Sequence, residues 1–186
     1  MKPQLWIVGG ANGSGKSTLA DRYLADRVPV LNPDNIARQR PGITPIEAGK
    51  VAIRMQKQYL GSGQNFAWET TLSGHREIPF MQEAKGAGYK VNLVYLGVLD
   101  SSLSILRVAE RVESGGHNVP RQDIERRFDR SLENLSGAIA AADRAWIFDN
   151  SSDQRRLLLS VENDLVKHCS RDLPDWLAKF LPSVFP

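Results

Sequence analysis

One stretch, residues 10–17 (Gly-Ala-Asn-Gly-Ser-Gly-Lys-Ser), constrains the fold of this chain more than any other. It matches the Gly-x-x-x-x-Gly-Lys-Ser pattern of a phosphate-binding P-loop at every fixed position. The apolar run Leu5–Val8 before it is typical of a buried parallel strand, and Leu19, Tyr23 and Leu24 after it share one face of a helix. The alternative, an ordinary glycine-rich turn, explains neither flank. We therefore expect a tight turn from a strand into a helix that binds a nucleoside triphosphate.

Each residue type in this loop has a role in that chemistry. The glycines let backbone N–H groups curve around phosphate oxygens, and the helix N-terminus adds a partial positive charge. Lys16 is expected to reach the β- and γ-phosphates, and the Ser17 hydroxyl to ligate Mg²⁺. The predicted nucleotide-binding residues are Gly10, Ala11, Asn12, Gly13, Ser14, Gly15, Lys16, Ser17 and Thr18, together with Arg127 from later in the chain.

The composition favours a single globular α/β domain over residues 1–186, because 41% of the residues are apolar and 24% are charged. The net charge of +3 comes without a continuous Lys/Arg tract, which argues against a nucleic-acid partner. No apolar run approaches the roughly 20 residues of a membrane span. A core strand close to the N-terminus leaves no room for a signal peptide, and the single Cys169 cannot form an internal disulfide. We therefore expect a cytoplasmic protein.

Apolar runs alternate with helical patterns along the chain, which predicts a parallel sheet with right-handed crossovers. The predicted strands are residues 5–8, 28–31, 65–68, 90–98 and 145–148. The predicted helices are residues 18–24, 45–60, 76–84, 101–111, 120–142 and 153–168, with Cys169 at the end of the last one. Thr44, Pro45 and Glu47 form a capping box for the second of these helices, and Asp100 is the expected N-cap of the fourth.

Three observations favour a kinase among the P-loop proteins. No strand ends in the Asp-Glu pair of ATP-hydrolysing motors, and the Asn-Lys-x-Asp guanine-binding motif is missing from the sequence. Asp34 and Glu69 follow the second and third predicted strands, where an acceptor would meet the γ-phosphate. Residues 107–130 combine several arginines with a Gly-Gly pair, which is typical of a mobile lid that delivers positive charge to the phosphates.

Each candidate also has a structural interpretation. Asp34 is a candidate general base for an acceptor hydroxyl, although Asn-Pro-Asp-Asn is also a good turn sequence. Glu69 could bind the acceptor or hold Mg²⁺ through water, or act as a partner of a helix dipole. In the lid, Arg111 and one of the three residues Arg126, Arg127 and Arg130 are the expected phosphate contacts, and the others form a solvated helix face. His117 could contact phosphate or bond within its own loop.

A set of motifs carries a family resemblance. In chain order these are Gly10–Ser17, Asn32-Pro33-Asp34, Trp68-Glu69-Thr70-Thr71, Arg111 with Gly115–Pro120, and Asp149-Asn150-Ser151. They resemble the zeta toxin family of P-loop kinases. The resemblance implies a three-layer sandwich around a five-stranded parallel sheet of order 2-3-1-4-5. It also implies ATP and Mg²⁺ as cofactors, the 3′-hydroxyl of the amino sugar in UDP-N-acetylglucosamine as acceptor, and a small helical antitoxin as partner.

The resemblance also assigns roles to individual residues. Asp34 matches the catalytic base, Glu69 the substrate-binding acid and Thr71 a substrate-contacting threonine. Arg111 matches one of two phosphate-binding arginines, which with Lys16 completes the predicted catalytic set. His117 stands where the second arginine would be and is a candidate substrate contact. The residues after Thr71 depart from the Gly-Thr-Gly-Arg pattern of the family's sugar-nucleotide pocket.

The leading hypothesis is therefore a Mg·ATP-dependent phosphotransferase with a small hydroxyl-bearing acceptor. Two alternatives remain open at this stage. One is a nucleotide-gated binding module that turns over no acceptor. The other is a kinase that acts on nucleosides or on nucleic-acid ends, which the modest net charge disfavours.

Overall fold

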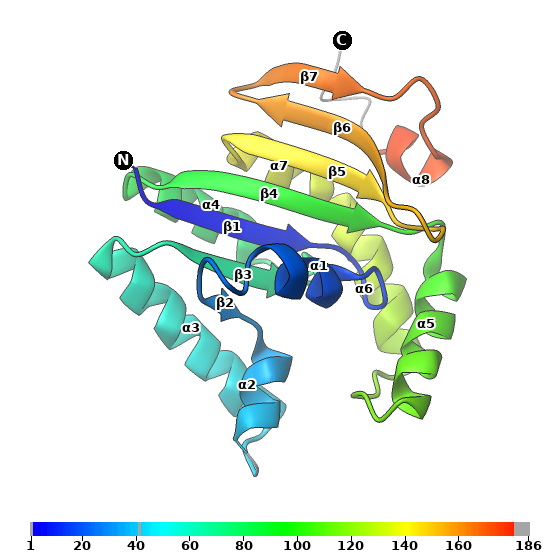
Figure 1. The fold of residues 1–186 in the computed structure, drawn as a ribbon, viewed down its shortest axis with the longest axis horizontal. Helices are drawn as coiled ribbons and strands as arrows, with labels where there is room; N and C mark the ends of the chain where they lie inside the picture. Colours follow the sequence, from blue (N-terminus) through cyan, green and yellow to red (C-terminus); the bar gives the residue numbers. More distant parts are fainter. Residues whose placement is uncertain (1, 41, 181–186) are drawn as a thin grey trace.

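A twisted sheet runs through the whole molecule in the computed structural model, which describes residues 2–40 and 42–180 (Figure 1). Its strands are β1 (Gln4–Gly9), β2 (Val30–Leu31), β3 (Phe66–Thr70), β4 (Lys90–Gly97), β5 (Arg144–Asp149), β6 (Arg156–Glu162) and β7 (Leu165–Cys169). The helices are α1 (Lys16–Tyr23), α2 (Pro33–Gln39), α3 (Pro45–Ser62), α4 (Glu77–Gly86), α5 (Ser101–Glu113), α6 (Arg121–Glu133), α7 (Leu135–Ala141) and α8 (Asp175–Ala178). None of the helices in these ranges combines the length and apolarity needed to cross a membrane.

The strand order is β2-β3-β1-β4-β5-β6-β7. The first five strands are parallel, whereas β6 pairs with β5 and β7 pairs with β6 in antiparallel fashion. The predicted five-stranded, all-parallel sheet of order 2-3-1-4-5 is therefore wrong for the sheet as a whole. Two further strands extend the parallel part beyond β5, so the architecture is a mostly parallel α/β sheet.

The predicted helix over residues 153–168 is wrong, because this segment forms the β6–β7 hairpin (Figure 1). Its turn consists of Asn163 and Asp164, whose φ angles of 50° and 62° are both positive. Asn and Asp tolerate this backbone region, and two such residues form the tight turn that suits the twist of a hairpin. Pairing with β5 also buries Leu158 and Leu159, which a surface helix would leave partly exposed. Cys169 accordingly lies exposed on β7.

The helix predicted over residues 120–142 is interrupted in the structure. Asn134 ends α6 and precedes α7, and its side chain turns back to donate hydrogen bonds to the carbonyls of Leu72 (2.9 Å) and Gly74 (3.0 Å). The interruption thus ties this pair of helices to the loop that follows β3. By contrast, the predicted caps are confirmed: Thr44 and Glu47 form a capping box, and Asp100 caps α5.

The two faces of the sheet are covered unequally. The larger core lies under α4, α6, α7 and α8, where Phe80, Leu135 and Trp176 pack against the strands. The other face carries a smaller cluster, to which α1 contributes Leu19 and its C-cap Leu24. Within the described ranges, no other helix supplies a buried side chain to this second cluster.

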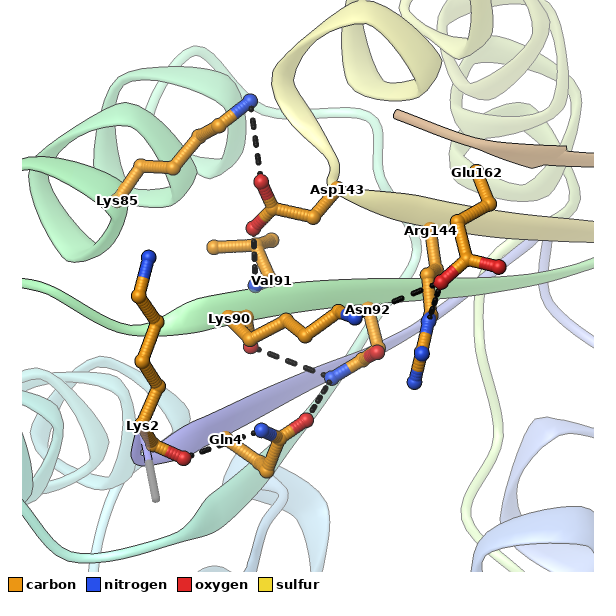
Figure 2. Close-up of polar contacts among 9 residues, drawn as sticks. All are labelled: Lys2, Gln4, Lys85, Lys90, Val91, Asn92, Asp143, Arg144 and Glu162. Carbon is orange, nitrogen blue, oxygen red and sulfur yellow. Dashed lines mark hydrogen bonds and ion pairs between the residues drawn. The ribbon is translucent and has the colours of Figure 1, made fainter. Parts of the chain in front are cut away.

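A polar network closes the end of the sheet at which the parallel strands begin (Figure 2). Asp143 accepts a hydrogen bond from the Val91 N–H (2.8 Å) and lies 3.6 Å from the Lys85 ammonium. Glu162 lies 2.6 Å from Arg144 Nε and 3.5 Å from Lys90 Nζ. Both carboxylates are therefore neutralised by neighbours, and this network links α4, β4, β5 and β6.

Candidate active site

The P-loop occupies the turn from β1 into α1, as the sequence predicts. Gly13 and Gly15 have φ angles of 74° and 92°, in the left-handed region that favours glycine. A Cβ on Gly15 would lie 2.6 Å from the Asn150 side-chain nitrogen, and one on Gly13 would lie 2.8 Å from the Ser104 carbonyl oxygen. Both positions therefore require glycine, for backbone geometry and for close packing against the neighbouring segments.

Lys16 is buried at the start of α1, and its ammonium donates a hydrogen bond to the Ala11 carbonyl (2.8 Å). Burial lowers the pKa of Lys16 from its ordinary 10.5 to about 8. Neighbouring charges also act on this pKa: Glu69 and Asp34 raise it, whereas Arg111 and Arg127 lower it. The fold therefore brings four predicted site residues, from four separate segments, into electrostatic range of Lys16.

Two further side chains of the loop end in buried atoms without a partner. Among the described residues, neither the Ser14 hydroxyl nor the Asn12 side-chain oxygen has a hydrogen-bond partner. A buried polar atom without a partner is costly unless a ligand or water satisfies it. The Ser14 hydroxyl, the backbone N–H groups of the glycine-rich loop and the Lys16 cation are donors that together suit the phosphate chain of a nucleotide. The Asn12 oxygen is an acceptor and needs a donor instead.

Glu69 connects three segments of the site. It lies in β3, is only 7% exposed, and accepts hydrogen bonds from the Ser17 hydroxyl (2.7 Å) and from the Asn32 side chain (2.7 Å). Because Ser17 lies in the first turn of α1, the Glu69 carboxylate also lies at a helix N-terminus, so its interpretations as a ligand-binding acid and as a helix-dipole partner both remain open. Sequence reasoning named Asn32 only as part of the Asn-Pro-Asp motif and gave it no role. Its position directly after β2, beside the strand that carries Glu69, was the available signal.

Asp34 lies at the second position of α2 and is exposed. The Asn-Pro-Asp-Asn segment begins a helix: Asn32 caps α2 and accepts a hydrogen bond from the Asp34 N–H (2.8 Å). The single residue Asn32 thus orients both acidic candidates, Glu69 through its side-chain nitrogen and Asp34 through its oxygen. This geometry presents the Asp34 carboxylate to solvent on the side of the P-loop.

The loop after β3 is held rigidly. Glu77 accepts hydrogen bonds from the Thr70 hydroxyl (2.8 Å) and from the Gly74 N–H (3.3 Å). Leu72 is fully buried with a φ of 55°, a strained conformation for a residue with a branched side chain. The half-buried Thr71 precedes it, and its hydroxyl pairs with that of Ser73 at 2.8 Å. The loop thereby presents two hydroxyls beside Glu69.

The predicted lid, residues 107–130, forms a helical hairpin of α5 and α6 with a small core of its own around Val108, Val119 and Ile124.

The arginines of the lid differ in their contacts. Arg111 donates a hydrogen bond to the His117 carbonyl (2.7 Å), so the backbone of this exposed loop holds the arginine. Arg126 forms an ion pair with Asp123 on the solvated face of α6. Arg127 lies one position further on and acts on the Lys16 pKa. Arg111 and Arg127 are therefore the lid arginines whose charges act on Lys16.

A second missed feature connects the lid helix to the P-loop. Arg107 donates hydrogen bonds to the carbonyls of Asn150 (2.7 Å) and Ser151 (3.3 Å). The Asn150 side chain in turn donates to the Ser14 carbonyl (2.9 Å). Arg107 thus holds the segment after β5, and Asn150 holds the P-loop. The signal for this link was the position of Asn150 directly after a parallel strand, at the same edge as Gly9.

Comparison with known proteins identifies the family of the chain. Residues 1–157 match the family described as zeta toxin, and the chain therefore belongs to the zeta toxin family. A protein of Haemophilus influenzae described as uncharacterized is 35% identical over 144 residues, a region that covers 69% of this chain and 99% of the relative.

Two solved structures share the fold. One is the complex of AvrRxo1-ORF1 and AvrRxo1-ORF2 with ATP, with 19% identity and a TM-score of 0.73 over 98% of this chain. The other comes from the PezAT toxin-antitoxin system of Streptococcus pneumoniae, with 18% identity and a TM-score of 0.69 over 96% of this chain. The alignments cover 63% of the first solved chain and 78% of the second.

Proposed function

We propose that this protein is a Mg·ATP-dependent phosphotransferase that transfers the γ-phosphoryl group to a hydroxyl of a small acceptor. The observation that carries the proposal is the Ser17–Glu69–Asn32 connection. It places a hydroxyl suited to Mg²⁺ next to a buried carboxylate, and it orients Asp34 at the same edge of the sheet. A site for nucleotide binding alone would not need a second, exposed carboxylate held beside the P-loop.

Different residues of the chain would have different roles in phosphoryl transfer. The loop N–H groups, the Ser14 hydroxyl and Lys16 would hold the phosphates, and Ser17 would ligate Mg²⁺ with Glu69 behind it. Bound Mg·ATP supplies the phosphoryl group and a metal ion that withdraws negative charge from it. Arg111 and Arg127 add positive charge next to Lys16 without a reorganisation cost at the moment of transfer. Asp34 would accept the proton of the acceptor hydroxyl.

Family membership suggests a nucleotide sugar, UDP-N-acetylglucosamine, as the acceptor. Thr71 and Glu69 would contact it from the β3 edge, and His117 from the lid. The proposed partner is an antitoxin protein, because one structural neighbour belongs to a system described as toxin-antitoxin. The proposed location is the cytoplasm, where ATP is available and the exposed thiol of Cys169 stays reduced.

The test compares the wild type with Asp34→Asn in ATP consumption with Mg²⁺, against a panel of nucleotide sugars, nucleosides and small alcohols. We expect one acceptor to stimulate turnover, and Asp34→Asn to lower kcat about 10²–10⁴-fold while ATP affinity is unchanged. Asp129→Asn, which changes another exposed carboxylate that no predicted role involves, is the matched control. Equal turnover by wild type and Asp34→Asn would refute the base assignment. ATP binding without stimulation by any acceptor would instead favour a nucleotide-gated module.

A further inference from the structure

The face of the sheet that carries α1 contains a large groove away from the P-loop. Its volume is about 670 Å³. The side chains of Trp6, Val94, Trp146 and Phe148 form its floor, and Leu19 and Tyr23 of α1 form one wall. Trp6 and Trp146, on β1 and β5, stack with ring centroids 6.0 Å apart and an interplanar angle of 16°. The catalytic candidates do not line this groove.

The groove exists because this face is incompletely covered. Parallel strands normally have both faces buried under helices. Here α1 is the only helix in the described ranges that packs onto this face, and the chain continues after β5 as a hairpin rather than as a helix. Trp6, Trp146 and Phe148 consequently stay half-buried, and Tyr23 is 48% exposed. An apolar surface of this kind on a sheet marks an interaction site.

The rim of the groove is positively charged. Arg22, Arg27 and Arg155 line it, and none of them has a carboxylate within 4.0 Å among the described residues. The Arg155 guanidinium lies 6.0 Å from the ring centroids of Tyr23 and Phe148, and its buried Nε atom has no hydrogen-bond partner. The guanidinium of Arg155 is therefore not fully satisfied by the described residues.

We infer that this groove binds an acidic amphipathic helix of a partner protein. A helix would supply the cover that the sheet lacks, with its apolar side on Trp6 and Trp146. Its carboxylates would pair with Arg22, Arg27 and Arg155. Aromatic side chains and arginines are also the residue types that dominate binding energy at protein interfaces. A second copy of this chain fits poorly, because a symmetric contact would bring two sets of three arginines together.

The test uses two synthetic helical peptides as probes. Both carry Leu and Phe at i, i+3, i+4 and i+7, with Glu at the remaining positions in one and Lys in the other, and neither contains Trp. Binding is followed by the change in tryptophan emission, which reports on Trp6 and Trp146 because Trp68 and Trp176 are buried and do not line the groove. We expect the Glu peptide to bind and the Lys peptide not to bind. Arg22→Glu/Arg155→Glu should weaken binding of the Glu peptide about tenfold or more, and salt should weaken it in the wild type.

Matched controls separate this result from misfolding. Arg54→Glu/Lys57→Glu changes the same number of charges on the exposed face of α3 and should leave peptide binding intact. ATP affinity should be the same in all variants, because none of these residues belongs to the phosphate site. Arg27→Glu provides a second test if the double variant unfolds.

Four results would overturn the inference. The first is equal binding of the Glu and Lys peptides, and the second is binding that the arginine changes leave intact. The third is a wild-type dimer in sedimentation that Arg22→Glu changes, which would assign the face to a second copy. Binding of the anionic dye anilinonaphthalene sulfonate at these arginines, without binding of the Glu peptide, would assign the groove to a small anionic ligand instead and so also overturn it.

Discussion

The two ends of the parallel strands both carry dense polar clusters, and the clusters differ in how fully they are paired. Where the strands begin, Asp143 and Glu162 are each paired with Lys or Arg side chains (Figure 2). Asn92 also lies here, and its side-chain nitrogen makes three hydrogen bonds although its oxygen has no partner. Where the strands end, the Ser14 hydroxyl lacks a partner and Lys16 has a lowered pKa.

This difference separates structural polar clusters from functional ones. A cluster that neutralises itself contributes to the free energy of folding and offers little to a ligand. A cluster with a desolvated cation and unpaired atoms is kept at a cost in stability, which a ligand can offset. A change at the P-loop end should therefore lower activity without lowering the free energy of unfolding. A change at the opposite end should lower the free energy of unfolding without affecting activity.

The largest effect is expected from Lys16→Met. We expect kcat/KM for the proposed transfer to fall about 10³-fold or more, since Lys16 is the central phosphate contact. The free energy of unfolding of the nucleotide-free protein should rise by about 1–3 kcal/mol, because the variant removes a buried, desolvated charge. Turnover assays and urea denaturation at neutral pH measure the two quantities. A stability loss as large as that of a core deletion would show that the lysine is a structural residue.

The second prediction concerns the pH dependence of nucleotide affinity. The folded-state pKa of Lys16 is lowered to about 8, so the lysine is charged below that pH and neutral above it. Binding above pH 8 must therefore take up a proton, and affinity for ATP should fall by up to about tenfold per pH unit as pH rises. Titration calorimetry in buffers of different ionisation enthalpy measures this uptake. Lys16→Arg, which stays charged, should lack this fall. A flat wild-type profile would contradict the lowered pKa.

A smaller effect is expected at the opposite end, from Asp143→Ala. The change leaves the Val91 N–H without its side-chain acceptor and Lys85 without its partner, so the free energy of unfolding should fall by about 1–2 kcal/mol. ATP affinity and turnover should stay at wild-type values. Asp143→Asn keeps an acceptor for Val91 and should recover most of the stability. A loss of ATP affinity in either variant would show that the two ends are coupled.

The smallest effect is expected from Glu162→Gln. The hydrogen bond from Arg144 lowers the pKa of Glu162, so its contribution to stability is present above the usual carboxyl range. That contribution is lost as pH falls through the lowered folded-state pKa. Thermal unfolding should therefore distinguish wild type from variant at neutral pH, and the difference should vanish in acid. A difference that persists in acid would assign the effect to packing.

The parts of the fold that depend on local sequence were predictable. The P-loop and the caps of α3 and α5 each depend on a few consecutive residues with one strongly favoured geometry. The β6–β7 hairpin was not predicted, because its apolar residues also suit a helix. Whether this segment forms a strand or a helix depends on its pairing with β5, a tertiary contact that no local sequence pattern reveals. The Asn163-Asp164 turn was the one local indication.

In the candidate site, too, the features set by local sequence were predictable and those set by tertiary contacts were not. Sequence position alone placed Lys16, Glu69 and Asp34 at one edge of the sheet, since the carboxyl ends of parallel strands meet there. It did not reveal Asn32 or the Arg107–Asn150 connection, because these side chains act through contacts between segments far apart in the chain. That Arg111 and Arg127 act on Lys16 likewise became evident only from the packing of α5 and α6.

The β6–β7 hairpin also forms one exposed edge of the sheet. It makes β7 the outer strand, and all five of its residues are exposed, including Leu165 and Val166. An outer strand with apolar side chains is a template for strand addition by another molecule. Two features oppose such aggregation: β7 is short, and it carries the charge of Lys167 in its centre. The opposite edge is protected differently, because β2 has only two residues. Short strands therefore limit strand addition at both edges, and Lys167 adds a charge against it at the β7 edge.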